Sequence, residues 1–287
     1  ILINTIKKKE KICILGDYDV DGASATSLLI RYFDYIKQDY FYYIPDRKTD
    51  GYGASTLLFQ KLIKQKPKLI IMVDCGSTSR EAIDYLNQNN IKSIIIDHHE
   101  IAKPYPKSNV IINPKKKTDY SEYDYLCATT LTYFFIDKVI QKTKSKFKLS
   151  EFLIYVLLAT VCDVMPLRKL NKILALNVIK NFKLESNLAF KAIFDQLCLK
   201  RKLTVEDLGF LIGPIINSGG RLGFPDYGTE LLSSNNADTL QKKTLKLINL
   251  NYKRKKLEKK ILNEINFNNI NKENKNVIIY YNNKIHE

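Results

Sequence analysis

Residues 11–22 read Lys11-Ile-Cys-Ile-Leu-Gly-Asp-Tyr-Asp-Val-Asp-Gly22, a short apolar run that ends in a loop with three alternating aspartates. Two later apolar runs end in a similar way. Leu69-Ile-Ile-Met-Val73 precedes Asp74-Cys-Gly76, and Ser93-Ile-Ile-Ile96 precedes Asp97-His98-His99. Runs of this length and composition predict buried parallel strands. Parallel strands deliver the residues after them to one edge of the sheet, where open α/β folds usually have their functional site.

The segments between these runs predict the fold class. The expected helices are residues 23–36, 54–64 and 80–88, and the expected further strands are residues 40–44 and 110–112. Alternation of this kind predicts an α/β fold with a doubly wound, mainly parallel sheet over about residues 10–115. Apolar residues then recur at helical spacing, which predicts a helical part over about residues 120–235.

A long, lysine-rich connector helix is expected at residues 236–272. Its basic side chains indicate either a solvated connector or a surface that faces a nucleic-acid groove. Residues 273–287 contain Asn276-Val-Ile-Ile-Tyr-Tyr281, which predicts the first strand of a second domain. Because the chain begins with Ile1 and almost nothing follows this strand, we expect a chain that is cut at both ends.

Composition narrows the class of protein. A chain of 287 residues that is 45% hydrophobic can bury a sizeable core. Its five cysteines form no Cys-x-x-Cys pair, which indicates a reducing, intracellular compartment. We expect no membrane segment, because no apolar run approaches the roughly 20 residues that span a bilayer, and no signal peptide is evident. The expected location is the cytoplasm.

The net charge of +16 suggests a polyanionic partner, because lysine and arginine contacts to phosphate dominate nucleic-acid affinity. An AT-rich genome also produces a chain rich in lysine, isoleucine and asparagine. The net charge alone therefore does not establish that the protein binds a polyanion. Arginine positions are more informative. Arg47 and Arg221 lie in glycine-punctuated segments beside the expected site, where arginine indicates a need for its bidentate fork.

The aspartates and histidines at the predicted strand ends indicate a metal site. One aspartate would suffice to cap the helix after the first loop, whereas Asp17, Asp19 and Asp21 repel one another unless cations neutralise them. His98 and His99 are two of only three histidines, and they suggest one imidazole on metal and the other on substrate phosphate. Carboxylate oxygens and imidazole nitrogens together suit one or two divalent metals.

Two further aspartates complete the predicted set. Asp74, at the end of a neighbouring strand, is placed to bridge two ions. Asp163 ends an apolar helical segment in Thr160-Val-Cys-Asp163-Val-Met-Pro166, and a carboxylate in such surroundings is usually paired. It is a candidate last ligand. The sequence therefore predicts a metal-dependent hydrolase.

These motifs, in this order and spacing, resemble the four motifs of the DHH phosphoesterase superfamily. They are Asp17-Tyr-Asp-Val-Asp-Gly22, Val73-Asp-Cys-Gly76, Asp97-His-His99 and Ala159-Thr-Val-Cys-Asp-Val-Met-Pro-Leu167. The segments Pro45-Asp-Arg-Lys-Thr-Asp-Gly-Tyr-Gly53 and Asn217-Ser-Gly-Gly-Arg-Leu-Gly223 resemble more specifically those of its bacterial single-strand-specific 5′→3′ DNA exonucleases. The resemblance covers about residues 10–287.

The resemblance implies a role for each candidate residue. Two Mn²⁺ or Mg²⁺ ions would be held by the metal-ligand set Asp17, Asp19, Asp21, Asp74, His98 and Asp163, with Asp17 either a direct ligand or one layer out. His99 would contact the scissile phosphate, and Asp74 and Asp97 would join it in catalysis. The DNA backbone or its terminal phosphate would be held by Arg47, Asn217 and Arg221. Residues 1–235 would form the catalytic domain, and residues 273–287 the start of a truncated second domain, named DHHA1.

The implied activity is two-metal hydrolysis of single-stranded DNA from a 5′ end, which releases 5′-mononucleotides in DNA repair and recombination. The implied protein is a monomer, with a single-strand-binding protein and a helicase as candidate partners. Metal binding is expected to survive without the second domain, whereas exonuclease activity without it is left open. Two alternatives remain: a nanoRNase or 3′-phosphoadenosine-phosphate phosphatase that acts on very short substrates, and a non-catalytic nucleic-acid-binding module.

Overall fold

The computed structural model describes residues 1–51, 53–117 and 121–264. Its centre is a five-stranded sheet in the order β2-β1-β3-β4-β5, with every neighbouring pair parallel. The strands are β1 (Ile12–Leu15), β2 (Tyr40–Tyr43), β3 (Leu69–Val73), β4 (Lys92–Ile96) and β5 (Val110–Ile112). The predicted α/β class with a parallel sheet is confirmed.

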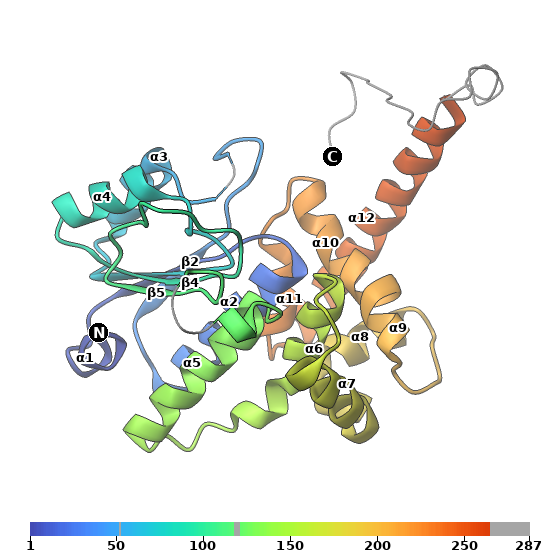
Figure 1. The fold of residues 1–287 in the computed structure, drawn as a ribbon. Coiled ribbons are helices and arrows are strands. Elements are labelled where there is room, and N and C mark those ends of the chain that lie inside the picture. The colour runs from blue at the N-terminus through green and yellow to red at the C-terminus, as the bar shows by residue number, and fades with distance from the viewer. Residues whose placement is uncertain (52, 118–120, 265–287) are drawn as a thin grey trace.

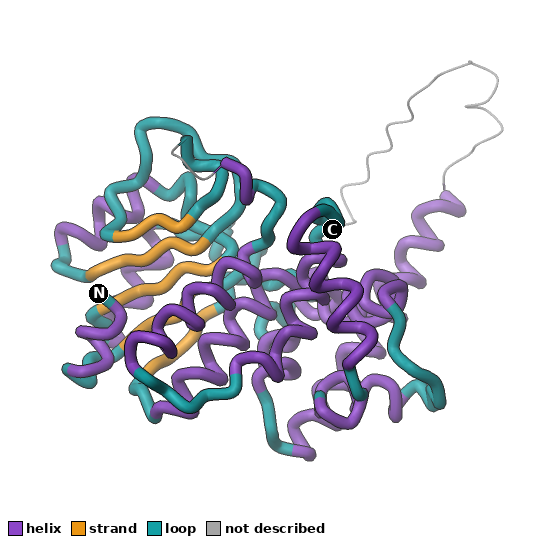
Figure 2. The backbone as a smooth tube through the Cα atoms, turned by 60° about the horizontal axis from the view of Figure 1, so that its bottom comes forward, coloured by secondary structure: helices purple, strands orange, loops and turns teal. Residues whose placement is uncertain are grey.

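Helices cover both faces of the sheet (Figures 1 and 2). On one face lie α1 (Leu2–Lys7), α2 (Val20–Ile36) and α5 (Ala128–Thr143), and on the other lie α3 (Thr56–Leu62) and α4 (Arg80–Gln88). Side chains alternate along each strand, so that Ile12 and Ile14 pack with the first group while Cys13 and Leu15 pack with the second. Burial on both faces explains why the central strands β1 and β3 are continuously apolar.

The rest of the described chain is helical, as predicted. Its helices are α6 (Leu153–Cys162), α7 (Lys169–Asn181), α8 (Leu188–Gln196), α9 (Val205–Asp207), α10 (Gly213–Arg221), α11 (Tyr227–Ser233) and α12 (Ala237–Glu264). The described residues also form the short 3₁₀ helices η1 (Ile63–Gln65), η2 (Ser121–Tyr123), η3 (Leu149–Phe152) and η4 (Leu184–Ser186), and the π-helix η5 (Leu208–Ile212). Apolar side chains of α6, α8 and α10 belong to the same core as α2 and one face of the sheet, so the two halves pack as one body.

The lysine-rich α12 leaves the body of the molecule along its length (Figure 1). Leu240, Leu247 and Leu250 are buried, whereas most side chains after Asn251 are exposed. The last part of the predicted connector, up to residue 272, and the predicted strand at residues 276–281 lie outside the described residues. Among the helices that the structure describes, none combines the length and apolar character that crossing a bilayer requires.

Candidate metal centre

The predicted acidic residues meet at the carboxyl edge of the sheet. Asp17, Asp19 and Asp21 follow β1, Asp74 follows β3, and residues 97–99 follow β4. Helix α2 begins at Val20, earlier than the predicted start at Ala23, because Asp19 caps it by accepting a hydrogen bond from the Gly22 amide (2.9 Å). Asp21 therefore belongs to the first turn of a helix that points away from the sheet edge.

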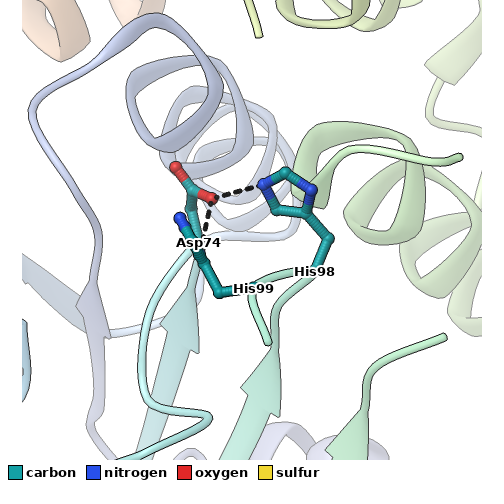
Figure 3. A group of neighbouring side chains, drawn as sticks. All are labelled: Asp74, His98 and His99. Atoms are coloured by element: carbon teal, nitrogen blue, oxygen red, sulfur yellow. Dashed lines mark ion pairs between the residues drawn. The ribbon is translucent and has the colours of Figure 1, made fainter. Parts of the chain in front are cut away.

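His98 lies among three carboxylates. Its Nε2 atom is 3.3 Å from Oδ2 of Asp163, 3.4 Å from Oδ1 of Asp74 and 3.6 Å from Oδ2 of Asp21. Figure 3 shows Asp74 facing both His98 and His99, with the two histidines coming from the end of one strand. Asp163 reaches the same point from the end of α6, so the helical half supplies part of the centre.

Three overlapping groups of ligand atoms result, each with its atoms within 4.8 Å of one another. They are Asp17, Asp19 and Asp74; Asp21, His98 and Asp163; and Asp74, His98 and His99. Asp74 belongs to the first and the third group. A carboxylate shared in this way is suited to bridge two neighbouring ions.

Several buried polar atoms in the centre make no hydrogen bond among the described residues. Both carboxylate oxygens of Asp74 and both ring nitrogens of His98 are buried without a hydrogen bond among the described residues. Buried polar groups are normally satisfied, and an unpaired buried carboxylate is costly. Carboxylate oxygens are the ligands that Mn²⁺ and Mg²⁺ prefer in proteins, and imidazole nitrogens suit divalent transition metals. The residues of the centre therefore fit divalent cations.

The electrostatics of the centre agree with this fit. Burial and the neighbouring aspartates raise the pKa of Asp74 well above its usual range. Burial and the charges of Asp21 and Asp19 raise the pKa of Asp163 to about 7. Burial and Asp19 likewise raise the pKa of Asp17 to about 6. The protein on its own thus disfavours full ionisation of these carboxyls, which bound cations would reverse.

Asp21 is held in place by a second helix. Its two oxygens accept hydrogen bonds from the backbone amides of Ala128 and Thr129, each at 2.7 Å, and the Thr129 hydroxyl donates to the Asp21 carbonyl (2.9 Å). These amides form the N-terminus of α5, where unpaired N–H groups favour a negative charge. The fold thereby fixes Asp21 on the side of the centre that faces His98.

Asp97 has a different position from the other aspartates. It accepts hydrogen bonds from the Ser77 amide (3.0 Å), the His98 amide (2.8 Å) and the His99 ring at Nδ1 (2.8 Å). Burial works to raise the pKa of Asp97, but hydrogen bonds from His99 and Ser77 hold it well below the usual range. Asp97 lies outside the three ligand groups found among the described residues and orients His99 instead.

Asn113 is a contributor that the sequence analysis missed. Its amide nitrogen donates to the Ser77 hydroxyl (2.7 Å) and to the His99 carbonyl (2.9 Å), which ties the ends of β3, β4 and β5 together. The available signal was its place directly after β5, since residues at that position reach the same edge of the sheet.

The predicted phosphate-binding residues come from two parts of the chain, the loop after β2 and helix α10. The Arg47 guanidinium lies over the Tyr18 ring, 4.5 Å from its centroid. Helix α10 carries Asn217 and Arg221, and the Oδ1 atom of Asn217 is buried without a hydrogen-bond partner among the described residues. Burial raises the pKa of Tyr18, while the charges of Arg47 and Arg221 both act to lower it. The Arg221 end of α10 meets the first acidic loop, because a Cβ atom on Gly220 would lie 1.9 Å from the Tyr18 ring.

Both the sequence and the fold of this chain resemble those of known proteins. The DHH family, N-terminal domain, matches residues 11–160. The chain is 28% identical over 271 residues to the single-stranded-DNA-specific exonuclease RecJ of Haemophilus influenzae, a match that covers 90% of this chain and 47% of that protein. It is 29% identical over 273 residues to the RecJ of Escherichia coli, with the same two coverages.

A solved structure gives the same relationship. The crystal structure of exonuclease RecJ bound to manganese superposes with a TM-score of 0.83 at 25% identity, over 92% of this chain and 67% of that chain. The 287 residues span about half the length of the curated relatives named here.

Proposed function

Because this chain belongs to the DHH family, we propose that it is the metal-binding part of a single-strand-specific DNA exonuclease that works in the 5′→3′ direction. One observation carries the proposal. Asp74 and His98 present buried oxygens and nitrogens that make no hydrogen bond among the described residues, at the point where three overlapping ligand groups meet. The resemblance to RecJ proteins supports single-stranded DNA as the substrate.

In this proposal Asp17, Asp19, Asp21, Asp74, His98 and Asp163 hold two Mn²⁺ or Mg²⁺ ions. Two ions held there would lower the pKa of a bound water and stabilise the negative charge that develops on the phosphate in the transition state. His99 contacts the scissile phosphate. Because its Nδ1 atom faces Asp97 at 2.8 Å, its Nε2 atom is the one left for the substrate. The His99 pKa is raised mainly by that hydrogen bond, which favours an imidazole that carries a positive charge toward phosphate.

Arg47, Arg221 and Asn217 are proposed to hold the DNA backbone or its 5′-phosphate. Guanidinium groups match phosphate with two parallel hydrogen bonds. Both arginines are exposed. Arg47 lies over the Tyr18 ring, and Arg221 follows Gly220, which packs against the same ring. A 5′-phosphate held by these residues would fix how many nucleotides of the DNA strand lie between it and the ions. This would favour release of single nucleotides.

The test is hydrolysis of single-stranded DNA that carries a 5′-phosphate and a label at either end. We expect release of 5′-mononucleotides with Mn²⁺ and none with EDTA. A substrate series from dinucleotide to long strand separates the alternatives. Cleavage confined to di- and trinucleotides would replace the proposal with a nanoRNase activity. Mn²⁺ binding with no cleavage of any length would limit this chain to binding.

Asp195→Asn is the matched control for this experiment. Asp195 is an exposed aspartate on α8, a helix that carries none of the proposed site residues, and it pairs only with Lys191 among the contacts described. We also propose that the protein acts in the cytoplasm as a monomer, with a single-strand-binding protein and a helicase as partners. Light scattering of the purified chain tests the monomeric state.

A further inference from the structure

Tyr18 is an aromatic residue between two of the proposed ligands, Asp17 and Asp19. Its side chain is 8% exposed, although it belongs to a loop at the edge of the sheet. The Arg47 guanidinium lies over the ring, 4.5 Å from its centroid. An aromatic face attracts a guanidinium through its quadrupole, most strongly where water is partly excluded. Tyr18 therefore offers Arg47 a fixed platform next to the metal centre.

The same ring also contacts helix α10. A Cβ atom built on Gly220 would lie 1.9 Å from Cδ2 and 2.2 Å from Cγ of Tyr18. Since Gly220 lies within α10 and has no positive φ, its backbone conformation does not explain the glycine. The ring needs the space that a side chain would take. Tyr18 thus packs directly on the backbone of the helix that carries Asn217 and Arg221.

Helix α10 reaches the centre at two points. Near its start, a Cβ atom on Gly213 would lie 2.4 Å from Sγ of Cys162, the residue before Asp163. Near its end it meets Tyr18 at Gly220. The helix therefore runs from the Asp163 side of the centre to the Asp17 side. Tyr18 fixes the second of these contacts.

Arg47 lies in a loop that is held by hydrogen bonds within residues 46–50 and is open at its two glycines. Gly51 and Gly53 adopt φ values of +80° and +70°, and among the described residues, their chain neighbours apart, no atom lies within 4 Å of a Cβ built on either. Asp50 closes the loop by accepting from the Asp46 amide (3.1 Å) and from the Tyr43 hydroxyl (2.7 Å). These bonds shape the loop near the sheet, and the Tyr18 ring extends that support to the Arg47 guanidinium.

We propose that Tyr18 is a positioning residue that holds Arg47 and helix α10 against the metal centre, so that metal and phosphate are gripped at a fixed separation. The inference rests on the proposed function of the site. It assigns to Tyr18 an effect on phosphate recognition and none on metal binding. That division distinguishes it from a residue that merely stabilises the fold.

The first test compares Tyr18→Leu with the unmodified chain. We expect KM for 5′-phosphorylated single-stranded DNA to rise about tenfold, with kcat and Mn²⁺ affinity by calorimetry nearly unchanged. Tyr18→Phe, which keeps the ring, should recover most of the lost affinity. An unchanged KM in a folded Tyr18→Leu protein would overturn the proposal, and so would an equal loss of Mn²⁺ affinity.

A double-mutant cycle with Arg47 sharpens the test. If Tyr18 acts through Arg47, then Arg47→Ala should raise KM much less in the Tyr18→Leu background than in the unmodified chain. Full additivity of the two effects would overturn the proposal. Phe194→Leu on α8 is the matched control, because Phe194 is also buried with an arginine, Arg201, 5.8 Å from its centroid. It should lower stability and leave KM unchanged.

Two further measurements test the role of Tyr18 if Tyr18→Leu does not fold or if the chain does not cleave DNA. Replacing Tyr18 with fluorinated phenylalanines of nearly the same shape weakens the face of the ring stepwise, and affinity for 5′-phosphorylated DNA should fall in step. The same ring series crossed with Arg47→Ala in urea unfolding requires no DNA. Absence of coupling there overturns the positioning role. Coupling without any DNA binding overturns the proposed function and leaves the contact in place.

Discussion

The Nδ1 atom of His99 lies 2.8 Å from Oδ1 of Asp97, and the same oxygen accepts the backbone amides of His98 and His99. One buried carboxylate thus fixes both the ring and the backbone that carries it. Because Asp97 is ionised, it requires a proton on Nδ1 and leaves Nε2 toward the substrate. The first residue of the Asp-His-His motif therefore acts through the third.

Asp97→Asn should lower kcat by about 100-fold, the range for a hydrogen-bond partner behind a functional imidazole. Asparagine can present its amide N–H₂ to Nδ1, which would favour the other tautomer and misdirect the ring. Mn²⁺ affinity should change little, because Asp97 lies outside the ligand groups found among the described residues. Steady-state kinetics and calorimetry check both parts. A variant with wild-type kcat would remove the proposed role of Asp97.

Asp74→Ala should abolish hydrolysis and weaken Mn²⁺ binding, by more than the roughly 100-fold expected for an outer partner. Asp74 belongs to two of the three ligand groups, and its buried oxygens make no hydrogen bond among the described residues. Without metal the variant should be at least as stable as the parent, since a buried carboxylate that makes no hydrogen bond among the described residues is removed. Urea unfolding with EDTA tests this second part. Retained activity would contradict the two-metal arrangement.

Asp163 makes the stability of the metal-free chain depend on pH. Its pKa is about 7 in the folded protein, because of burial and the charges of Asp21 and Asp19, against about 3.9 in an unfolded chain. The folded state therefore binds more protons between these values. By linkage, this group contributes stability that is full below about pH 4 and is lost as pH rises through about 7.

The Asp163→Asn substitution removes that dependence. In EDTA we expect the variant to be more stable than the parent at pH 8, by about 1–2 kcal/mol, because the side chain is 28% exposed and solvent screens part of the effect. The difference should vanish near pH 4. With Mn²⁺ at pH 8 the order should reverse, because only the parent keeps the ligand. Equal pH profiles for the two proteins would show that Asp163 does not titrate in this range.

Much of this site follows from sequence alone, for a physical reason. Residues directly after parallel strands lie at one edge of the sheet. The positions of the short apolar runs in the sequence therefore predict that Asp17, Asp74 and His98 lie close together. Helix α1 was not expected. It is only six residues long, and its helical state depends on burial of Leu2 and Thr5 against the body.

Sequence patterns do not predict the contacts between segments that lie far apart in the chain. Asp163 was predicted as a ligand from its apolar surroundings and the family resemblance, but its 3.3 Å approach to His98 depends on how α6 packs. The anchoring of Asp21 by α5 and the packing of Tyr18 on Gly220 depend equally on tertiary structure. Such contacts are set by packing of whole elements, which local sequence patterns do not specify.

Gly22 shows how closely the first loop is folded on helix α2. A Cβ atom at this position would lie 2.6 Å from the carbonyl oxygen of Asp17 and 2.7 Å from its backbone nitrogen. Both are backbone atoms, so no side-chain rotation can relieve the clash. Glycine is required there by close approach of the chain, because the helix itself would favour alanine.

Gly22→Ala should therefore lower the free energy of unfolding by about 2–3 kcal/mol, against the gain of up to about 1 kcal/mol that alanine normally gives inside a helix. The clash would displace Asp17 and Asp19 together, so Mn²⁺ affinity should fall as well. Gly209→Ala is the control, because its Cβ would meet only a side-chain methyl, Cγ1 of Val161, at 3.2 Å. Urea unfolding and calorimetry would measure both effects. A Gly22→Ala protein that matches the parent in stability and Mn²⁺ affinity would show that the acidic loop can shift without harm, and that the carboxylates are not held as rigidly as these contacts require.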